Sequence, residues 1–428
     1  MKRRNKTETP RANERGRAAQ LLAQVVMPPN RTIDQVLSRH NLTPFESELL
    51  YGVVRRLNTL KAAVQPFLRQ PFRRKDGDVE MLLLVGAYQL YFTDIPSHSA
   101  VDETVGACAA LRKPWAKGLL NAVLRKVADT SATLTDRTFE QPSWLIEEVT
   151  ESYDQPQEIL GALSERAPMT LRVNRARIAP ERYVEALEVA GIDHDRNWHA
   201  ETITLKQPMA QARLPGFADG WVATQDAAAQ FAAHLLAVQP GDLWLDACAA
   251  PGGKLFHGIE TQPESRAVAL ELKESRAQTL RQEADRLGHR QFSLLVGDAE
   301  GRDWWAGEPF DRILLDSPCS GTGTIRRNPD IRLHQSPEGV LELAALQRRL
   351  LANLWQMLKP GGSLLYCTCS ILRQENDDII RAHLDQSPDA TTAPIELPSG
   401  ERTELGWQLL PTDYKTDGFY YAQLMKAS

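Results

Sequence analysis

The chain has 428 residues, of which 42% are hydrophobic and 25% are charged. This length exceeds what one ordinary core organises and favours two or three domains, and the composition is that of a soluble globular protein. No apolar run approaches the ~20 residues that a membrane-spanning helix needs. The five cysteines are odd in number and too scattered for a disulfide framework. We expect a reduced, cytoplasmic protein outside the membrane, and in the absence of any oligomer signal we expect a monomer.

The net charge of −5 conceals an asymmetry along the chain. Residues 1–130 contain 21 Lys and Arg against 12 Asp and Glu, a balance of +9, and the remainder contains 29 against 43, a balance of −14. Basic side chains bind nucleic acids by neutralising phosphates and releasing counterions. A basic segment on an acidic chain therefore suggests a nucleic-acid partner, with a solubilising basic tail as the alternative.

The first third of the chain has the apolar spacing of helices. Residues 1–16 are polar and charged and are predicted to be disordered, whereas residues 16–127 repeat apolar side chains every three or four positions. Residues 79–92 are apolar nearly all round, as in the central helix of a bundle. Two more helices are predicted within 98–113 and 115–128, followed by a linker at 129–136.

A small α+β module is predicted next. A helix within residues 142–153 precedes a strand at 169–174, a helix at 179–192 and a strand at 201–206. This pattern suits a compact RNA-binding module, although any small α+β insert has the same pattern.

From about residue 214 strands and helices alternate. Short apolar strands are predicted at 242–247, 267–272, 292–298, 311–316 and 363–368, with helices between them such as 341–358. This alternation predicts an α/β fold with a mostly parallel, doubly wound sheet. Ligands of such sheets bind at the carboxyl ends of the strands.

Chemically suggestive residues cluster at those ends. "LDACAAPGGK" is a glycine-rich turn from a strand into a helix, where paired glycines allow a ligand to approach the backbone closely. The sequence of this turn matches neither the G-x-G-x-x-G motif of dinucleotide-binding proteins nor the phosphate-binding loop that ends in GKS or GKT. Glu271 ends the next strand, where an acid commonly binds a ribose diol, and Asp298 follows the third strand, where it could accept from an adenine amino group. The alternatives are a surface glutamate and a turn-capping aspartate.

Three motifs together resemble one enzyme family. "FDRILLDSPCSGTGTIRRNPDIR", "LDACAAPGGK" and "LKPGGSLLYCTCSI" resemble, in order and spacing, the RNA cytosine-5 methyltransferases of the NOL1/NOP2/Sun family. These enzymes use S-adenosylmethionine (SAM) on a Rossmann-like domain. The rest of the chain is similar to the bacterial branch that acts on 16S ribosomal RNA. That likeness implies a basic tail and NusB-like RNA-binding domain at 1–138, a linker helix and α+β module at 139–213, and a methyltransferase domain at 214–428.

The resemblance also implies a set of site residues. SAM would be bound by Cys248, Ala249, Ala250, Pro251, Gly252, Gly253, Lys254, Glu271, Asp298 and Asp316. Asp316 would contact the N3/N4 edge of the cytosine, oriented by Lys254, and RNA phosphates would be held by Arg326, Arg327 and Arg332. The family usually has Asp at 271, Thr at 255 and Ala at 367, and none of these departures removes a group that the chemistry needs.

The chemistry explains why cysteines are required. C5 of cytosine attacks a methyl sulfonium only after a thiolate has added to C6, and the thiolate must later be expelled. The resemblance makes Cys369 the nucleophile and Cys319 the residue that assists release, while the reverse assignment stays open because DNA cytosine-5 methyltransferases use the cysteine of their "PC" motif. Cys367 is expected to be packed. The cysteine pair is not a metal site, because no second ligand pair is spaced to complete one. Two other hypotheses are the same chemistry on a transfer RNA or another RNA, and an inactive RNA-binding assembly factor.

Overall fold

The computed structural model describes residues 10–130, 140–413 and 415–428. Contacts between residues divide the chain into two compact units. The helical unit lies within residues 1–146 and 325–334, and the α/β unit within residues 147–324 and 335–428.

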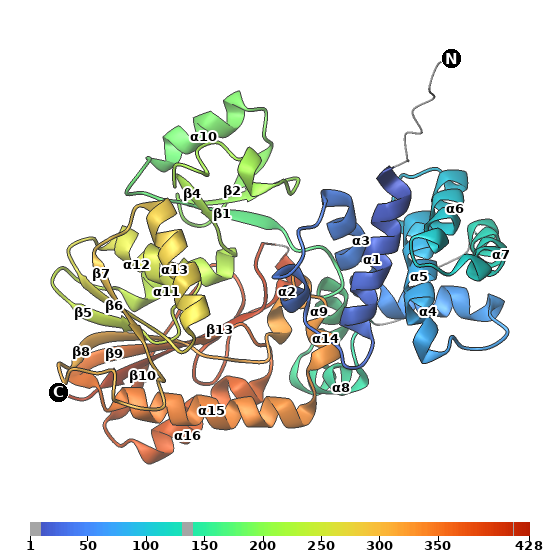
Figure 1. Ribbon diagram of the computed structural model, residues 1–428. Helices are drawn as coiled ribbons and strands as arrows, with labels where there is room; N and C mark the ends of the chain where they lie inside the picture. The colour runs from blue at the N-terminus through green and yellow to red at the C-terminus, as the bar shows by residue number, and fades with distance from the viewer. Residues whose placement is uncertain (1–9, 131–139, 414) are drawn as a thin grey trace. The chain divides into compact units, whose positions relative to one another are not determined.

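The helical unit is built around α5 (Gly77–Phe92), in which every residue from Met81 to Gln89 is buried. This burial agrees with the apolar composition of the segment and confirms the predicted central helix. Around it lie α1 (Pro10–Val26), α3 (Pro44–Arg55), α4 (Leu57–Val64), α6 (Ser97–Gly106) and α7 (Lys117–Asp129), while α2 (Ile33–Leu37) packs against α1 (Figure 1).

Local sequence signals fix where α3 begins. The Thr43 side chain accepts a hydrogen bond from the backbone N–H of Glu46, and the Glu46 side chain accepts one from the backbone N–H of Thr43. This reciprocal capping box satisfies two helix-end donors, and Pro44 suits the first turn because that position has no partner for an N–H.

Two N-terminal predictions have different outcomes. The prediction of disorder through residue 16 is wrong from Pro10 onward, because α1 already begins there. The first turns of α1 contain mostly polar and charged residues, so they lack the apolar spacing that predicts a helix. The buried apolar residues of this helix begin only with Ala18 and Ala19. Residues 1–9 and most of the predicted linker lie outside the described residues.

Residues 325–334 belong to the helical unit although they follow the "DSPCSGTG" motif in sequence. The Asp330 carboxylate accepts a hydrogen bond of 2.8 Å from the backbone N–H of Ile33. Leu333, in the short helix α14 (Ile331–His334), packs against the apolar core of the bundle. The chain thus passes from the α/β unit into the helical unit and back.

The α/β unit begins with α8 (Ser143–Ser152), most of which lies in it, and α9 (Pro156–Ala162), followed by a four-stranded antiparallel sheet. The sheet order is β2-β3-β1-β4, and α10 (Pro180–Val189) packs on it through Tyr183 and Leu187. The strands are β1 (Met169–Val173), β2 (His194–Arg196), β3 (Thr202–Leu205) and β4 (Val222–Thr224). The two predicted strands and the helix between them are therefore confirmed.

The large sheet has the order β11-β12-β13-β9-β8-β5-β6-β7, and β10 pairs with β13. The pairs among β5 to β9 are parallel, whereas β13 is antiparallel to β9. This topology confirms the predicted fold class. The strands are β5 (Leu243–Asp246), β6 (Arg266–Glu271), β7 (Phe292–Val296), β8 (Phe310–Asp316), β9 (Leu358–Thr368), β10 (Ala390–Ala393), β11 (Glu401–Arg402), β12 (Trp407–Leu409) and β13 (Phe419–Lys426).

Helices cover both faces of this sheet (Figure 1). Alternate strand residues contribute to two separate apolar clusters: Leu314 and Leu365 to one, Ile313 and Leu364 to the other. The first cluster takes in α11 (Ala227–Leu236), α12 (Gly253–Thr261) and α13 (Glu274–Leu287), and the second takes in α15 (Pro337–Trp355) and α16 (Asp377–Gln386). A strand buried on both faces reads as a continuous apolar run, which is why these strands were evident in sequence.

A buried ion pair joins the small sheet to the large one. Arg172 of β1 and Glu260 of α12 are linked at 2.9 and 3.0 Å, and both side chains are almost fully buried. Arg172 also donates to the backbone carbonyl of Gly253 at 2.6 Å. The small sheet therefore supports the turn that leads into α12. In the part of the chain that the structure describes, no helix is long and apolar enough to cross a membrane.

Candidate active site

Two cysteines from separate loops meet at the carboxyl edge of the large sheet. Cys369 follows the last residue of β9, and Cys319 lies in the loop after β8. The two strands are parallel neighbours with Asp316 opposite Cys367, so both loops leave the sheet at the same edge. The Sγ atoms of Cys319 and Cys369 are 3.4 Å apart, and both side chains are half-buried.

The surroundings of Cys319 favour its protonated form. The hydrogen bond to Cys369 and burial raise the pKa of Cys319 well above its ordinary value. Cys319 therefore holds its proton and can donate it toward the sulfur of Cys369. This arrangement suits a pair in which one sulfur acts as nucleophile and the other as proton carrier.

An ion pair lies beside the thiols. The Nζ atom of Lys254, in the first turn of α12, donates to Oδ2 of Asp316 at 2.6 Å and lies 4.8 Å from the ring centroid of Phe419. Burial opposes the charge on Lys254, but the Asp316 carboxylate raises the pKa of Lys254 above its usual range. Lys254 is thus a fixed cation that orients the carboxylate.

Cys367 contributes from inside the sheet. Its side chain is fully buried, as predicted, and its thiol donates to the Oδ1 atom of Asp316 at 3.5 Å. Burial raises the pKa of Cys367 well above its ordinary value. Cys367 is therefore a neutral packing residue that holds one oxygen of Asp316, while Lys254 holds the other.

Glu375 ties the two cysteine loops together. Its carboxylate is fully buried in the short 3₁₀ helix Arg373–Glu375. One oxygen accepts from the backbone N–H of Ser320 at 2.8 Å and from Gln347 at 3.1 Å. The other accepts from the hydroxyls of Ser320 and Ser370, both at 2.5 Å. Since Ser320 follows Cys319 and Ser370 follows Cys369, one carboxylate fixes the residue after each thiol.

A cavity of about 280 Å³ opens beside this site at the ends of β5, β6 and β7. Three of the residues predicted to bind the cofactor line it, namely Cys248, Glu271 and Asp298. Sequence reasoning did not identify the remaining lining residues, which are Ala247, Leu272, Lys273, Arg276, Gly297, Ala299, Glu300, Pro318, Leu346 and Leu350.

The other predicted cofactor residues lie outside the lining of this cavity. Ala249, Ala250, Pro251, Gly252 and Gly253 form the turn between β5 and α12, with Ala249 and Ala250 buried. Gly252 has φ of 108°, and a Cβ at this position would lie 2.2 Å from the Phe256 ring. This position therefore requires glycine on both conformational and steric grounds.

Acidic groups dominate the polar surface near the cavity. Glu271 is buried, with one carboxylate oxygen accepting from the backbone N–H of Lys273 and the other 3.7 Å from Arg276. Asp246, at the end of β5, is also buried, and its Oδ1 atom has no hydrogen-bond partner among the described residues. Burial, reinforced by the Asp316 charge, raises the pKa of Asp246 to about 7. Asp246 therefore binds a proton more readily than an ordinary aspartate does, and burial, not a ligand contact, is the main cause.

The arginines after the catalytic loop differ from expectation. Arg326 and Arg332 are only 1% and 6% exposed. Arg332 donates to the backbone carbonyls of Arg55 and Glu140 within the helical unit. Burial lowers the pKa of Arg332 to about 10. Protein atoms cover the Arg326 and Arg332 side chains in this conformation, whereas Arg327 is partly exposed. Contact of these arginines with RNA phosphates stays a prediction.

A histidine cluster lies elsewhere in the α/β unit. Glu201 accepts hydrogen bonds from His234 at 2.8 Å and His257 at 3.3 Å. His199, Glu201 and His234 each offer one potential metal-binding atom, and these three atoms lie within 4.8 Å of one another. The rings of His199 and His234, however, stack at 3.8 Å with an angle of 14°. Their in-plane lone pairs therefore run nearly parallel and do not converge on one ion. We interpret the cluster as a hydrogen-bond network.

Comparisons with known proteins cover nearly the whole chain. Family models match residues 12–129 (NusB family), 141–211 (the ferredoxin-like domain of RsmF/B-like methyltransferases) and 233–425 (16S rRNA methyltransferase RsmB/F). Ribosomal RNA small subunit methyltransferase B of Vibrio cholerae is 44% identical over 389 residues, covering 89% of this chain and 88% of the relative. The probable ribosomal RNA small subunit methyltransferase B of Coxiella burnetii is 39% identical and covers 97% and 99% of the two chains.

Solved structures show the same fold. The crystal structure of the protein PH0851 matches with a TM-score of 0.82 and 25% identity, covering 99% of this chain and 100% of that one. A methyltransferase homolog protein from Pyrococcus horikoshii matches with a TM-score of 0.59 and 26% identity, covering 71% and 98%.

Proposed function

This chain belongs to the 16S rRNA methyltransferase RsmB/F family, and we propose that it transfers the methyl group of SAM to C5 of one cytosine in 16S ribosomal RNA, cytosine 967 in the family's usage. The observation that carries the proposal is the pair of thiols 3.4 Å apart, beside a carboxylate that Lys254 orients. One sulfur can add to the base while the other stays protonated beside it.

The residues around the cavity fit SAM. Glu271 presents a buried carboxylate to a ribose diol, and Asp298 lies where an adenine amino group could donate. SAM carries both a sulfonium and an ammonium cation, so a cavity bordered by acids is electrostatically complementary. When bound, SAM supplies an electrophilic methyl group.

Cys369 starts the reaction in this proposal. Its thiolate forms a bond to C6 of the cytosine, and the electrons of the C5–C6 double bond make C5 nucleophilic toward the methyl group. Asp316 faces the N3/N4 edge of the base, where its carboxylate, held by Lys254 and Cys367, accepts from the exocyclic amine. The target nucleotide must leave any stack to reach the thiol.

Release of the product needs a proton to leave C5. Once C5 carries the methyl group, its hydrogen leaves as a proton to a water molecule and the C–H electrons restore the C5–C6 double bond. The C6–S bond breaks at the same time and returns its electron pair to Cys369. Cys319 lies 3.4 Å from that sulfur and can protonate it as it departs. The reverse assignment of the two cysteines predicts the opposite phenotypes.

Bisulfite mapping tests the proposal. Total RNA from cells with and without this protein is compared, with Cys369→Ala and a control, Cys108→Ala, which replaces a buried cysteine of the helical unit. We expect one 16S rRNA cytosine to lose its protection in the deletion and in Cys369→Ala but not in Cys108→Ala. Protection lost in a transfer RNA would support the alternative substrate, and unchanged RNA in the deletion would support a non-catalytic assembly factor.

A further inference from the structure

A large cavity lies within the helical unit, remote in sequence from every methyltransferase motif. It measures about 710 Å³ and lies between the loop that joins α4 to α5 on one side and α7, together with the turn that precedes α7, on the other. We call it the aromatic–basic groove. The aromatic and basic residues that line it include Arg69, Phe72, Arg73, Lys75, Trp115 and Lys126.

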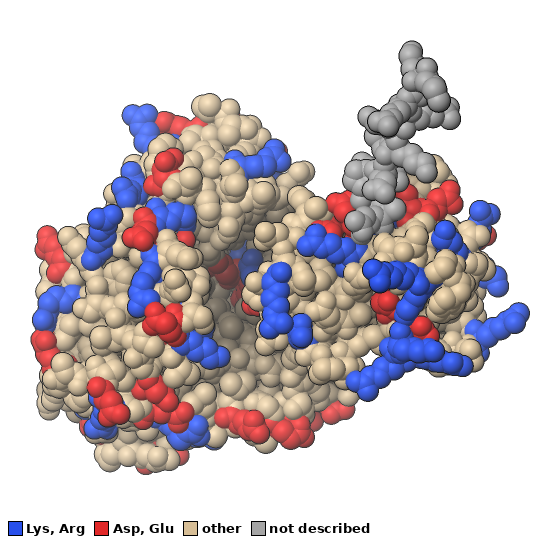
Figure 2. Space-filling view, viewed as in Figure 1, with Lys and Arg blue, Asp and Glu red and all other residues tan. Residues whose placement is uncertain are grey.

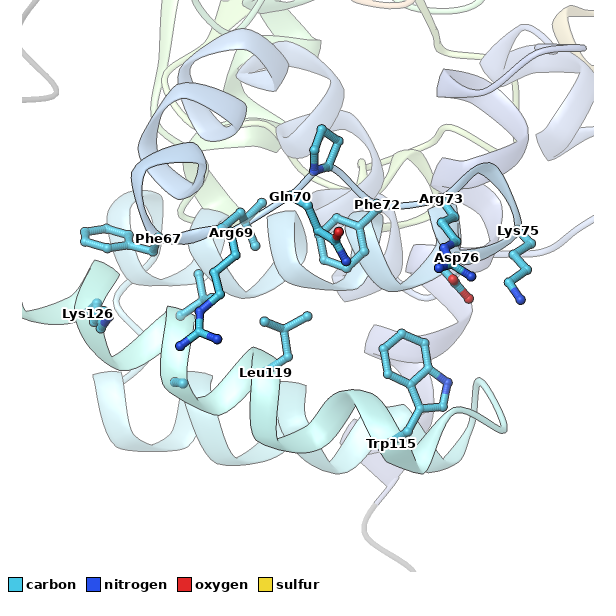
Figure 3. Close-up of a pocket in the computed structure, with 14 residues that line it drawn as sticks. Phe67, Arg69, Gln70, Phe72, Arg73, Lys75, Asp76, Trp115, Leu119 and Lys126 are labelled. Atoms are coloured by element: carbon cyan, nitrogen blue, oxygen red, sulfur yellow. The ribbon is translucent and has the colours of Figure 1, made fainter.

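The groove exposes large apolar side chains. Trp115, in the short 3₁₀ helix Pro114–Ala116, is 58% exposed, and Leu119, in the first turn of α7, is 37% exposed. Figure 3 shows Gln70 and Phe72 directed from the loop toward α7, with Trp115 at one end of the groove and Lys126 at the other. An indole exposed to this extent is unusual on a soluble surface and marks a binding site when it lines a concave wall.

The groove is also positively charged. Within the described chain, Arg69, Arg73 and Lys75 have no carboxylate within ion-pair distance, and Lys126 lies 5.9 Å from the ring centroid of Phe67. The lining carboxylate, Asp76, already pairs with Lys113 at 3.0 Å. Figure 2 shows Lys and Arg side chains gathered over this part of the helical unit. The unpaired cations would attract a polyanion.

A second hollow of about 200 Å³ adjoins the groove. It shares Arg69, Gln70 and Phe72 with the first and adds Lys61 from α4. The loop therefore lines two hollows with aromatic and basic side chains, and the second hollow also includes Glu80.

We propose that the aromatic–basic groove binds an unpaired, single-stranded segment of the RNA substrate. This inference rests on the proposed function and locates a second RNA contact away from the thiols. Bases would stack on Trp115 and Phe72, while Arg69, Arg73 and Lys75 neutralise the phosphates. The groove combines an exposed indole, a partly buried phenyl ring and several cations. Proteins hold single strands with such groups, because every base has a flat face and every linkage a charge.

Binding of a short single-stranded RNA, followed by fluorescence anisotropy at several salt concentrations, tests the proposal. Trp115→Ala should weaken affinity about 5- to 150-fold, as loss of one stacked base does, while Trp115→Phe retains most of it. The double variant Arg69→Gln/Arg73→Gln should flatten the salt slope by about 1.4, since each single-strand phosphate contact contributes about 0.7. The matched control Arg39→Gln/Arg125→Gln removes the same charge from exposed positions outside the groove and should leave the slope nearly unchanged.

The outcomes distinguish this inference from the proposed function. A wild-type protein that methylates 16S rRNA, together with groove variants that bind single-stranded RNA as tightly as wild type, would overturn the groove assignment alone and point to an acidic protein partner. A wild-type protein without methyl-transfer activity would instead contradict the proposed function. Because Trp115 is mostly exposed, its replacement should preserve the thermal unfolding midpoint, which serves as the folding control.

Discussion

Replacement of Glu375 by alanine or glutamine separates its hydrogen bonds from its charge. Alanine removes the acceptor of four hydrogen bonds at once. The hydroxyls of Ser320 and Ser370 lie 3.4 Å apart and can turn toward each other, but the backbone N–H of Ser320 and the amide of Gln347 lose this buried acceptor. At ~1–3 kcal/mol for each unsatisfied buried donor, Glu375→Ala should lower the free energy of unfolding by about 2–6 kcal/mol.

Glutamine should behave differently at this position. Its oxygen can keep the bonds to Ser320 N–H and Gln347, and its NH₂ can donate to the two hydroxyls, which then act as acceptors. The loss is then the charge-assisted part alone, on the order of 1 kcal/mol. We also expect methyl transfer to fall steeply in Glu375→Ala and to recover substantially in Glu375→Gln, because the spacing of the two thiols depends on both loops.

Denaturant unfolding and the single-turnover rate of methyl transfer measure both effects. The control is Glu404→Ala, which removes an exposed partner of Arg381 and should leave the free energy of unfolding nearly unchanged. If Glu375→Ala unfolds within about 1 kcal/mol of wild type, or methylates at the wild-type rate, Glu375 does not hold the cysteine loops in place.

Two further predictions concern buried charges. Arg172→Met leaves Glu260 without its guanidinium partner and should lower the free energy of unfolding by about 3–5 kcal/mol. The double variant Arg172→Met/Glu260→Met should recover part of this loss. A loss below about 1 kcal/mol for the single variant in denaturant titrations would contradict the role of this pair. The pKa of Asp246 is about 7 in the folded state against an ordinary value of 3.8. Between these pH values the folded state keeps a proton that the unfolded state has lost. The free energy of unfolding therefore falls as pH rises from about 4 to about 7 and is level above that. Asp246→Asn removes this loss, and its stability relative to wild type should rise by about 2–3 kcal/mol between pH 5 and pH 8 in the SAM-free protein; an advantage independent of pH would show that Asp246 is not protonated in the folded state.

The sequence predicted the strand ends of the active site well. Parallel strands buried on both faces are continuous apolar runs, and residues after them necessarily share one edge. Asp316, Cys319 and Cys369 could therefore be grouped before any coordinates were considered. Glu271 ends β6 as expected, and Asp298 lies two residues beyond β7.

Tertiary contacts escaped prediction because they leave no local signal. Glu375 stands in an ordinary polar stretch, and only the folded chain shows that it reaches a residue 55 positions away. The burial of Arg326 and Arg332 depends on residues 325–334 joining the helical unit, which no periodicity encodes. The aromatic–basic groove was missed because its loop has no repeating pattern between α4 and α5.

Detection of the covalent protein–RNA adduct tests the assignment of Cys369 most directly. Cys319→Ala is incubated with SAM and a 16S rRNA fragment, and the products are separated under denaturing conditions. The account predicts an RNA-linked band in Cys319→Ala that disappears in Cys319→Ala/Cys369→Ala. An adduct that accumulates in Cys369→Ala, or that persists in the double variant, would contradict it.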